Sequence, residues 1–323
     1  MQNSLTSIEL CAGAGGQALG LEKAGFAHNA IVEIDPHCCE TLRLNRPFWN
    51  VQETDLGLFE GTKYQGIDLL AGGLPCPPFS VAGKQLGKKD ERNLFPDAIR
   101  LVDEIRPKAI MIENVRGFLD AVFEDYRTHI KKQLKKLGYE THWRLLNASD
   151  FGVPQLRPRV VIIALRNDIK EHFEWPALHP LDPPTVGEVL LDLMSEKGWI
   201  GAKKWAQEAN DIAPTLVGGS KKHGGPDLGP TRAKKAWASL GVNGKLIANE
   251  APEKDFIGMP YLTVRMAARI QGFDDSWKFS GKKTAAYRQV GNAFPPPVAQ
   301  AVGKQLKLAL TTRKNYSVRS IAS

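Results

Sequence analysis

The feature that most limits how this 323-residue chain can fold is a glycine-rich turn near its start. Gly13-Ala14-Gly15-Gly16-Gln17-Ala18 fits the pattern G-x-G-x-x-A, between the apolar run Ser7–Ala12 and the helix-like segment Gly15–Phe26. Glu33 ends the next apolar run about 20 residues later, where such folds place an acid against a ribose hydroxyl. The pattern predicts a site for a nucleoside-containing cofactor. NAD and S-adenosylmethionine fit it equally, and a glycine turn without a ligand has the same pattern.

The rest of the first half alternates between strand-like and helix-like segments. Asp35 followed by Pro36 is typical of a helix N-cap with proline in the first turn. Further apolar runs rich in Ile, Val and Leu are predicted strands at 30–34, 67–73, 109–115 and 159–165. Helices are predicted at 94–105 and 122–138. Strands separated by helices predict an α/β fold, with a mostly parallel sheet covered on both faces.

The composition of the sequence changes after Trp175, where a cluster of prolines indicates a linker. The stretch 218–232 is rich in Gly, Lys and Pro and is predicted to be a loop, whereas 264–273 and 295–312 are predicted helices. Residues 197–248 carry nine Lys and Arg against three Asp and Glu, which is +6 of the chain's net +8. A local positive field suits DNA, although a solvated surface explains it equally well.

Composition excludes several other classes. With 42% hydrophobic and 24% charged residues, the chain is expected to be globular, and it has no apolar run long enough to span a bilayer. The N-terminal residues lack the pattern of a secretory signal, so we expect a cytoplasmic protein. The four cysteines form no CxxC pair, so we expect free thiols and no metal site.

Four residues at predicted strand ends could carry chemistry. Cys76 lies in GGLPCPPFS, where flanking prolines stiffen the backbone at the expected ligand edge of the sheet. Glu113 ends another strand and could donate a proton if burial raises its pKa. Arg157 and Arg159, two residues apart, could hold a phosphate or a base carbonyl. Each of these residues also has a purely structural explanation: Cys76 as an inert thiol, Glu113 as a hydrogen-bonded structural glutamate, and the two arginines as surface ion-pair partners.

The ordered set of motifs resembles the DNA (cytosine-5) methyltransferase family. The matching pieces run from about Ile8 to Gly303 and are LCAGAGG, GGLPCPPFS, ENVRGF, QLRPR, RMAARIQGF and YRQVGNAFPPPVA. The resemblance implies a doubly wound, Rossmann-like S-adenosylmethionine-dependent methyltransferase sheet with a smaller target-recognition domain. It places the catalytic domain at 1–175, completed by 284–323, and the target-recognition domain at 176–283.

The resemblance also implies catalytic roles. Cys76 is expected to attack C6 of a flipped-out cytosine, and Glu113 to contact N3 as an acid. Arg159 is expected to steady the base, with Arg157 as its supporting partner. The segment 80–92 resembles a loop that closes over the base.

For the cofactor, S-adenosylmethionine, the family implies that the turn from Leu10 to Gly16 cradles the methionine part. The residues expected to contact the cofactor are Leu10, Cys11, Ala12, Gly13, Gly15, Gly16, Glu33, Ile34, Asp55, Leu94 and Asn292. The family usually has an aromatic residue at the position of Cys11, so we expect a smaller contact there and weaker affinity, but retained activity.

Double-stranded DNA is the expected partner. The residues expected to contact it are Ser80, Lys84, Gln85, Thr215, Leu216, Ser220, Lys221, Lys222, His223 and Arg232. The chain resembles prokaryotic or phage modification enzymes, so we expect a monomer that works beside a cognate restriction endonuclease without a stable complex.

Three alternatives remain open at this point. A tRNA cytosine-5 methyltransferase would share the catalytic half, and the basic insert argues only weakly for duplex DNA. An NAD-dependent oxidoreductase would explain the glycine turn and Glu33, but not PCPPFS, QLRPR or GNAFPPP. A catalytically dead DNA-binding relative is disfavoured by the presence of Cys76 and Glu113.

Overall fold

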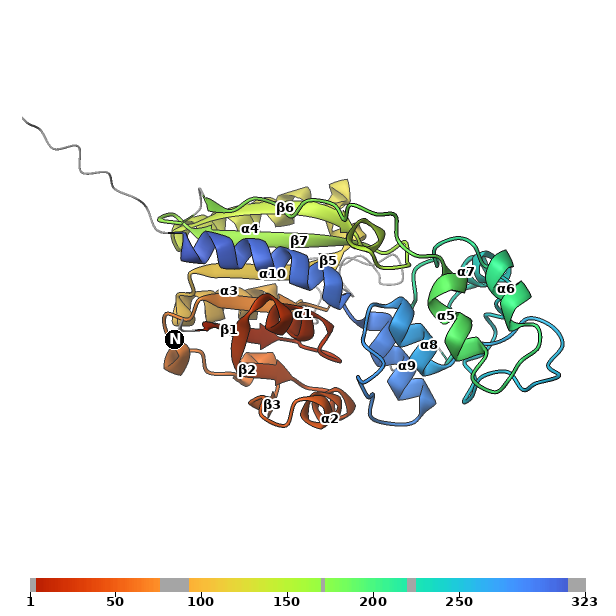
Figure 1. The fold of residues 1–323 in the computed structure, drawn as a ribbon. Helices are drawn as coiled ribbons and strands as arrows, with labels where there is room; N and C mark the ends of the chain where they lie inside the picture. Colours follow the sequence, from red (N-terminus) through yellow and green to blue (C-terminus); the bar gives the residue numbers. More distant parts are fainter. Residues whose placement is uncertain (1–3, 76–92, 170–171, 220–224, 313–323) are drawn as a thin grey trace, which may run out of the picture.

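The computed structural model describes residues 4–75, 93–169, 172–219 and 225–312. Seven strands form one sheet in the order β3-β2-β1-β4-β5-β7-β6 (Figure 1). The first five strands of that order pair in parallel, whereas β7 runs antiparallel to both β5 and β6. The strands are β1 Leu5–Leu10, β2 Phe26–Glu33, β3 Val51–Glu53, β4 Leu69–Gly73, β5 Ala109–Val115, β6 Tyr139–Asn147 and β7 Pro158–Arg166. The predicted α/β class with a mostly parallel, Rossmann-like sheet is confirmed.

The glycine turn joins β1 to helix α1 (Gly16–Ala24) as predicted. Gly15 caps the start of α1 at φ 84° and Gly25 ends it at φ 100°, both in the left-handed region that favours glycine. The predicted N-cap is also confirmed, because the Asp35 carboxylate accepts a hydrogen bond from the His37 N–H at the start of α2 (Pro36–Asn45). Local chemistry therefore fixes both connections at this edge of the sheet.

Helices cover both faces of the sheet (Figure 1). On one face α1 and α10 (Pro296–Thr311) bury Leu21 and Leu306 against strand residues such as Met111. On the other face α3 (Phe95–Ile105) and α4 (Glu124–Lys136) pack onto the sheet. Short 3-10 helices lie at η1 Leu56–Leu58, η2 Thr62–Tyr64, η4 Arg116–Leu119, η5 Ala121–Phe123 and η6 Ala148–Phe151. The C-terminal helix thus returns to the N-terminal half.

A helical lobe lies beside the carboxyl edge of the sheet (Figure 1). Its helices are α5 Val186–Met194, α6 Ala202–Glu208, α7 Thr231–Ala238, α8 Val264–Ile270 and α9 Lys283–Asn292. Buried residues of this lobe, such as Trp237, share one hydrophobic cluster with Leu19 and Leu42 from α1 and α2. The apolar core is thus continuous across the predicted boundary near residue 176, and the domain limits stay a prediction.

The sequence missed several elements. Strand β6 reads YETHWRLLN, with exposed polar residues between buried ones, because it is the edge strand of the sheet. Strand β3 is three residues long, and α6 and α7 have seven and eight residues, too short for a clear apolar period. Among the described residues, no helix is long and apolar enough to cross a bilayer.

The close approach of α1 to α10 depends on Gly20. A Cβ atom added there would lie 2.5 Å from the Ala299 Cβ and 2.8 Å from the Gln300 N. We therefore expect Gly20→Ala to lower the free energy of unfolding by about 1–3 kcal/mol, measured by urea denaturation, because α10 must shift. Gly225→Ala is the control, since a Cβ there meets nothing within 4 Å. Equal stability of the Gly20 variant and wild type would contradict this account of the packing.

Candidate active site

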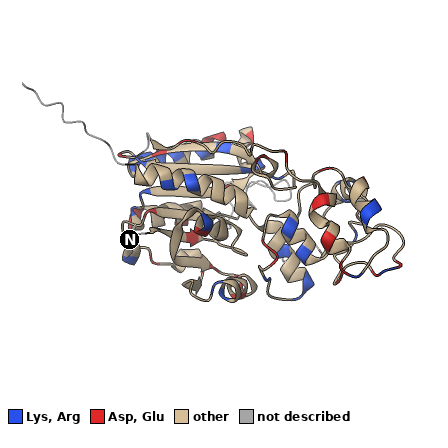
Figure 2. Ribbon diagram, viewed as in Figure 1, with Lys and Arg blue, Asp and Glu red and all other residues tan. Residues whose placement is uncertain are grey.

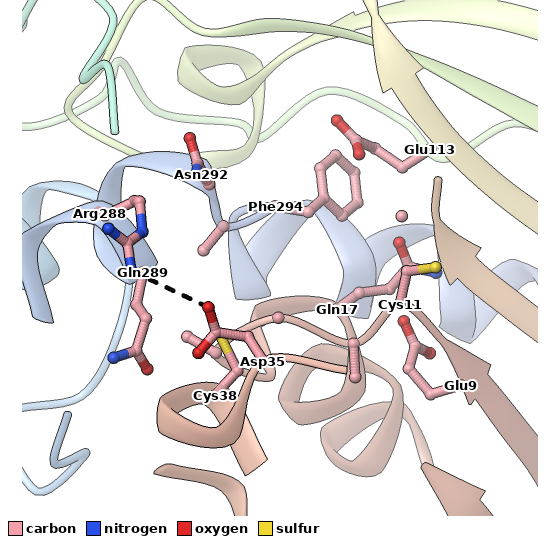
Figure 3. Close-up of a pocket in the computed structure, with 15 residues that line it drawn as sticks. Glu9, Cys11, Gln17, Asp35, Cys38, Glu113, Arg288, Gln289, Asn292 and Phe294 are labelled. Atoms are coloured by element: carbon pink, nitrogen blue, oxygen red, sulfur yellow. Dashed lines mark ion pairs between the residues drawn. The ribbon is translucent and has the colours of Figure 1, made fainter. Parts of the chain in front are cut away.

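A pocket opens at the carboxyl edge of the sheet, where strands β1, β4 and β5 end near the starts of α1 and α2 and the end of α9 (Figure 3). Parallel strands collect their ligand-binding groups at this edge. The lining residues are Glu9, Cys11, Ala12, Gly13, Ala14, Gln17, Asp35, Cys38, Gly73, Glu113, Arg288, Gln289, Asn292, Ala293 and Phe294. The structure therefore brings predicted cofactor residues and predicted catalytic Glu113 into one cavity.

Glu33 holds the glycine turn in place. Its carboxylate accepts hydrogen bonds from the N–H groups of Gly13 (2.7 Å), Ile34 (2.9 Å) and Asp35 (2.8 Å). The backbone of the turn is unusual, with Cys11 at φ 50° and Gly13 at φ 53°. The acid expected to meet a ribose thus also joins the ends of β1 and β2, and its role toward a cofactor stays a prediction.

Glu113 and Arg159 form an ion pair on neighbouring antiparallel strands. The Arg159 Nε lies 2.8 Å from the Glu113 Oε1, and both side chains are largely buried. Burial raises the pKa of Glu113, while the positive charges of Arg159 and Arg157 oppose that rise. Gly73 lies beside this carboxylate in the sheet and also lines the pocket. The pair therefore places a buried carboxyl group, oriented by a cation, on the wall of the pocket.

Arg157 is fully buried and binds main-chain carbonyls. Its Nη1 donates to the Leu216 carbonyl at 2.7 Å, and its Nη2 donates to the carbonyls of Gly291 (2.8 Å) and Ala293 (3.0 Å). These carbonyls belong to the segment after α6 and to the end of α9. Arg157, just before β7, therefore joins two distant segments to its own. Because it is buried, a structural role is favoured over a direct contact with DNA.

A second set of contacts strengthens this junction. The Leu216 N–H donates to the Gln155 Oε1 at 2.9 Å, and the Gln155 Nε2 donates to the Gln271 Oε1 at 2.7 Å. Gly218 and Gly291 let two backbones meet, since a Cβ on Gly291 would lie 2.5 Å from the Gly218 Cα. The segment around Leu216, predicted to contact DNA, therefore packs directly on the pocket wall formed by α9.

Asn292 and Arg288 form the part of the pocket wall that α9 contributes. The Asn292 Nδ2 donates to the Gly219 carbonyl at 3.2 Å, and the Arg288 Nη2 lies 3.9 Å from the Asp35 Oδ2 (Figure 3). Asn292 is exposed and remains positioned to reach a ligand. Polar contacts thus join α9 to the start of α2 and to the segment around Gly219.

The surroundings of the three described cysteines favour the protonated thiol over the thiolate. Burial, with nearby carboxylates led by Glu33, raises the pKa of Cys11 and Cys38, and the same causes raise that of Cys39 to about 12. Cys11 and Cys38 line the pocket, so they lie near any ligand there without being nucleophilic.

The predicted cofactor residues Leu10, Gly15, Gly16, Ile34, Asp55 and Leu94 do not line the pocket. Ile34 is 61% exposed, as a side chain that packs on a planar ring would be. The Asp55 carboxylate caps η1 through the Gly57 N–H, and Leu94 is the N-cap of α3. Leu10 is buried in the core, and Gly15 and Gly16 pack tightly against neighbouring segments.

Many predicted DNA-contact residues fall outside the described parts of the chain. Together with Cys76, the predicted nucleophile, they are Ser80, Lys84, Gln85, Ser220, Lys221, Lys222 and His223. Of the rest, Arg232 is exposed on α7, and the Thr215 hydroxyl donates to the Leu156 carbonyl at 2.5 Å. Leu216 is 1% exposed, so its burial does not favour a side-chain contact with DNA.

Sequence reasoning missed several pocket residues. Glu9, Gln17, Asp35, Arg288 and Phe294 line the cavity but were not among the predicted site residues. A charged residue inside the otherwise apolar run of β1 and a glutamine inside the glycine motif were the available signals. Among the described residues, no group of three His, Cys, Asp or Glu side chains could hold a metal ion.

The sheet order with its reversed β7, and the glycine turn beside the pocket, define the class of Rossmann-like methyltransferases. Within that class, residues 5–308 match the family of C-5 cytosine-specific DNA methylases, and the chain belongs to this family. The predicted family and the predicted enzyme class, a DNA (cytosine-5) methyltransferase, are therefore confirmed.

Named relatives agree with this assignment. The chain is 59% identical over 312 residues to the type II methyltransferase M.NgoMIV of Neisseria gonorrhoeae, covering 94% of this chain and 98% of that protein. It is 54% identical over 328 residues to the type II methyltransferase M.NaeI of Lentzea aerocolonigenes, covering 99% and 79%.

Solved structures share the fold. A candidate DNA modification methyltransferase encoded within an E. coli prophage aligns with TM-score 0.68 at 26% identity, covering 96% of this chain and all of that one. A mutant of Spodoptera frugiperda DNMT2 aligns with TM-score 0.66 at 20% identity, covering 94% and 100%, which supports the fold alone.

The junction at Arg157 can be tested by removing its guanidinium. We expect Arg157→Met to lower the free energy of unfolding by about 3 kcal/mol or more, because three buried carbonyls lose a charged donor. The control is Arg43→Met, which removes an exposed ion pair with Glu53 and should cost less than about 1 kcal/mol. Denaturant unfolding followed by circular dichroism measures both, and equal losses would be incompatible with the proposed junction.

Proposed function

We propose that this chain transfers a methyl group from S-adenosylmethionine to C5 of a flipped-out cytosine in a short duplex DNA site, through a covalent bond between Cys76 and C6. The observation that carries the proposal is the buried Glu113–Arg159 pair, which lies in the same pocket as the glycine turn. An acid and a cation at this edge are what a base needs while a thiolate adds to its ring.

S-adenosylmethionine fits the residues of the pocket. Glu9 and Gln17 are buried, line the cavity and have no hydrogen-bond partner for their side-chain polar atoms within the described residues, as expected of a site for a polar ligand. A Cβ on Gly13 would meet nothing within 4 Å, so the turn leaves open space. Ile34 would pack on the adenine, Asn292 and Leu94 would complete the site, and the bound group would supply an electrophilic methyl.

The protein's own groups prepare the cytosine. The Cys76 sulfur bonds to C6, and the C5–C6 electron pair moves onto C5 and toward N3. Glu113, in its protonated form, donates to N3 and stabilises the charge that collects there, while Arg159 orients the carboxyl. After C5 is methylated, water takes the C5 proton, the electron pair of that C–H bond re-forms the C5–C6 double bond, and the C6–S bond breaks to release the Cys76 thiolate. A stacked base cannot reach the pocket, so the target must be extruded.

The cysteine chemistry supports Cys76 as nucleophile. The other three thiols have raised pKa values, so they hold their protons near neutral pH. Cys76 comes three residues after β4, which ends beside Glu113 in the sheet. The strand that precedes the Cys76 segment therefore ends at the edge of the pocket.

DNA recognition is assigned to the 176–283 region. Figure 2 places Lys and Arg along α7, α8 and α9, but several are neutralised. Lys234 pairs with Asp227, Arg265 with Glu196, and Arg269 with Asp275. Exposed Arg232 on α7 remains available for DNA, and we propose that it reads a base while lysines of the preceding loop position phosphates.

The biological role we propose is that of a modification enzyme in a restriction-modification system. The two relatives described above are named type II methyltransferases, and one aligns over nearly its whole length. The match to a DNA methylase family favours duplex DNA over tRNA as substrate. Sequencing the methylome of cells that express the chain should reveal 5-methylcytosine within one short motif.

The covalent step predicts a trapped adduct. Duplex DNA with 5-fluorocytosine in the recognition site should form a denaturant-resistant adduct only with S-adenosylmethionine present, because fluorine cannot leave C5 as a cation. Cys76→Ser should give no adduct and little methylation, since a hydroxyl supplies almost no anion near neutral pH. Cys11→Ser, Cys38→Ser and Cys39→Ser should still trap. Near wild-type methylation by the Cys76 variant, or an adduct on another cysteine, would refute the assignment.

The acid role of Glu113 predicts a pH effect. Because burial raises the pKa of Glu113, the active protonated form persists to higher pH, and the single-turnover methylation rate should fall as pH rises through that pKa. Glu113→Gln keeps a donor but cannot titrate, so it should react more slowly, without this falling limb. An unchanged falling limb in the Gln variant would exclude Glu113 as its source.

The recognition assignment predicts two different losses of DNA binding. Arg232→Ala should lower specificity by weakening binding to the recognition site by about 10–100-fold, because a base contact is lost. Lys221→Ala should weaken binding to all sequences and reduce the slope of its salt dependence by about one unit. Fluorescence anisotropy over a range of salt concentrations measures both. Two folded variants that bind like wild type would show that these are not contact residues.

A further inference from the structure

The outward side of helix α4 carries a cluster of lysines in the half of the helix that ends at Lys136. All four are exposed, and they are Lys131, Lys132, Lys135 and Lys136. The inward side of the same helix buries Tyr126, Ile130 and Leu134 in the core. Because one helical turn takes 3.6 residues, the four lysines lie together on the side that faces away from the sheet. We call them the lysine face.

The charge of the lysine face is not compensated by the folded chain. Within the described residues none of its ammonium groups forms an ion pair, and the acids Glu124 and Asp125 lie in the first turn of α4. Lysines of the recognition region behave differently, because Lys204 of α6 pairs with Glu208, four residues further on. The lysine face therefore keeps the charge of all four ammonium groups.

This spacing of like charges opposes helix formation. Lys131 and Lys135 are four residues apart, and the other two lysines repeat that spacing, so equal charges face each other along the helix. The negative end of the helix dipole favours lysines in the last turn, but this effect does not reach the turn before it. A polyanion that contacts all four groups at once would offset the repulsion.

The lysine face is presented by a firmly held element. The Arg127 Nη1 donates to the carbonyls of Phe118 (2.7 Å) and Asp120 (2.9 Å), which fixes the first half of α4 to η4. In the second half, the Lys131 ammonium lies 5.8 Å from the ring centre of Trp143 on β6. The charges are therefore arranged along a packed helix and can match a regular row of opposite charges.

The lysine face is also remote from the pocket. Strand β5 ends at the pocket through Glu113, and β6 begins at the opposite edge of the sheet, since both run antiparallel to β7. Helix α4 connects β5 to β6, so it runs away from the pocket and from the helical lobe (Figure 1). A duplex whose base enters the pocket therefore meets a different part of the molecule.

We propose that the lysine face is a second binding surface for duplex DNA, which contacts phosphates and reads no sequence. Lysine ammonium groups are compact point charges that bind backbone phosphates without specifying bases. This inference rests on the proposed duplex substrate, because that DNA is the polyanion the enzyme meets in its work. A second segment held at α4 keeps the enzyme on DNA while the pocket leaves one site and finds the next.

Salt titration of binding to a duplex without the recognition site tests the surface. Each phosphate contact contributes about 0.9 to the slope of log K against log salt, so the double variant Lys132→Gln with Lys136→Gln should reduce that slope by about two units. The matched control is Lys304→Gln with Lys307→Gln, two exposed lysines on α10, which covers the opposite face of the sheet. The control should keep the wild-type slope.

A methylation assay separates this surface from the pocket. The α4 double variant should methylate a short duplex that contains only the recognition site at the wild-type rate, but a long DNA with one such site severalfold more slowly. An unchanged salt slope in the α4 variant, or an equal change in the α10 control, would overturn the proposal. So would loss of binding to phosphatidylglycerol vesicles without loss of DNA binding. Absence of methylation by wild type would instead overturn the proposed function, and the salt titration would still decide the role of the lysine face.

Discussion

The arrangement of the two lobes depends on the buried guanidinium of Arg157. It donates to the carbonyls of Leu216, in the segment after α6, and of Gly291 and Ala293, at the end of α9 beside the pocket. Because a buried carbonyl without a donor is costly, each segment is held where the guanidinium can reach it. Gln155 and Gln271 extend the same network. The pocket and the segment around Leu216 therefore cannot shift independently without breaking several hydrogen bonds.

The pocket places similar acids in different surroundings. Glu113 is paired with Arg159, Glu33 accepts hydrogen bonds from three backbone N–H groups, and Glu9 has no partner in the described residues. The same buried edge therefore holds one acid paired with a cation, one that fixes the turn and one without a partner among the described residues. Residue type alone does not assign these roles, because the neighbours decide which charge state each acid favours.

The distribution of charge on the folded chain also differs from the distribution along the sequence. The basic excess of residues 197–248 predicted a positive field, but part of it is compensated by acids outside that stretch, as in the pair of Lys197 with Glu253. Lys234 is compensated within the stretch by Asp227. A count along the sequence therefore overestimates the field that a DNA duplex would meet, since opposite charges from distant segments come into contact.

The sequence by itself determined the glycine turn, the Asp35 cap, the apolar strands that form the centre of the sheet and the order of motifs that marks the family, because each depends on neighbouring residues. It left edge strand β6 and the short helices undetected, since their apolar periods are weak. Only the tertiary structure decided that Arg157 is a buried junction and that Glu9 and Gln17 face the pocket. The partners of Arg157 lie 59 to 136 residues away, and no local pattern encodes a hydrogen bond over that separation.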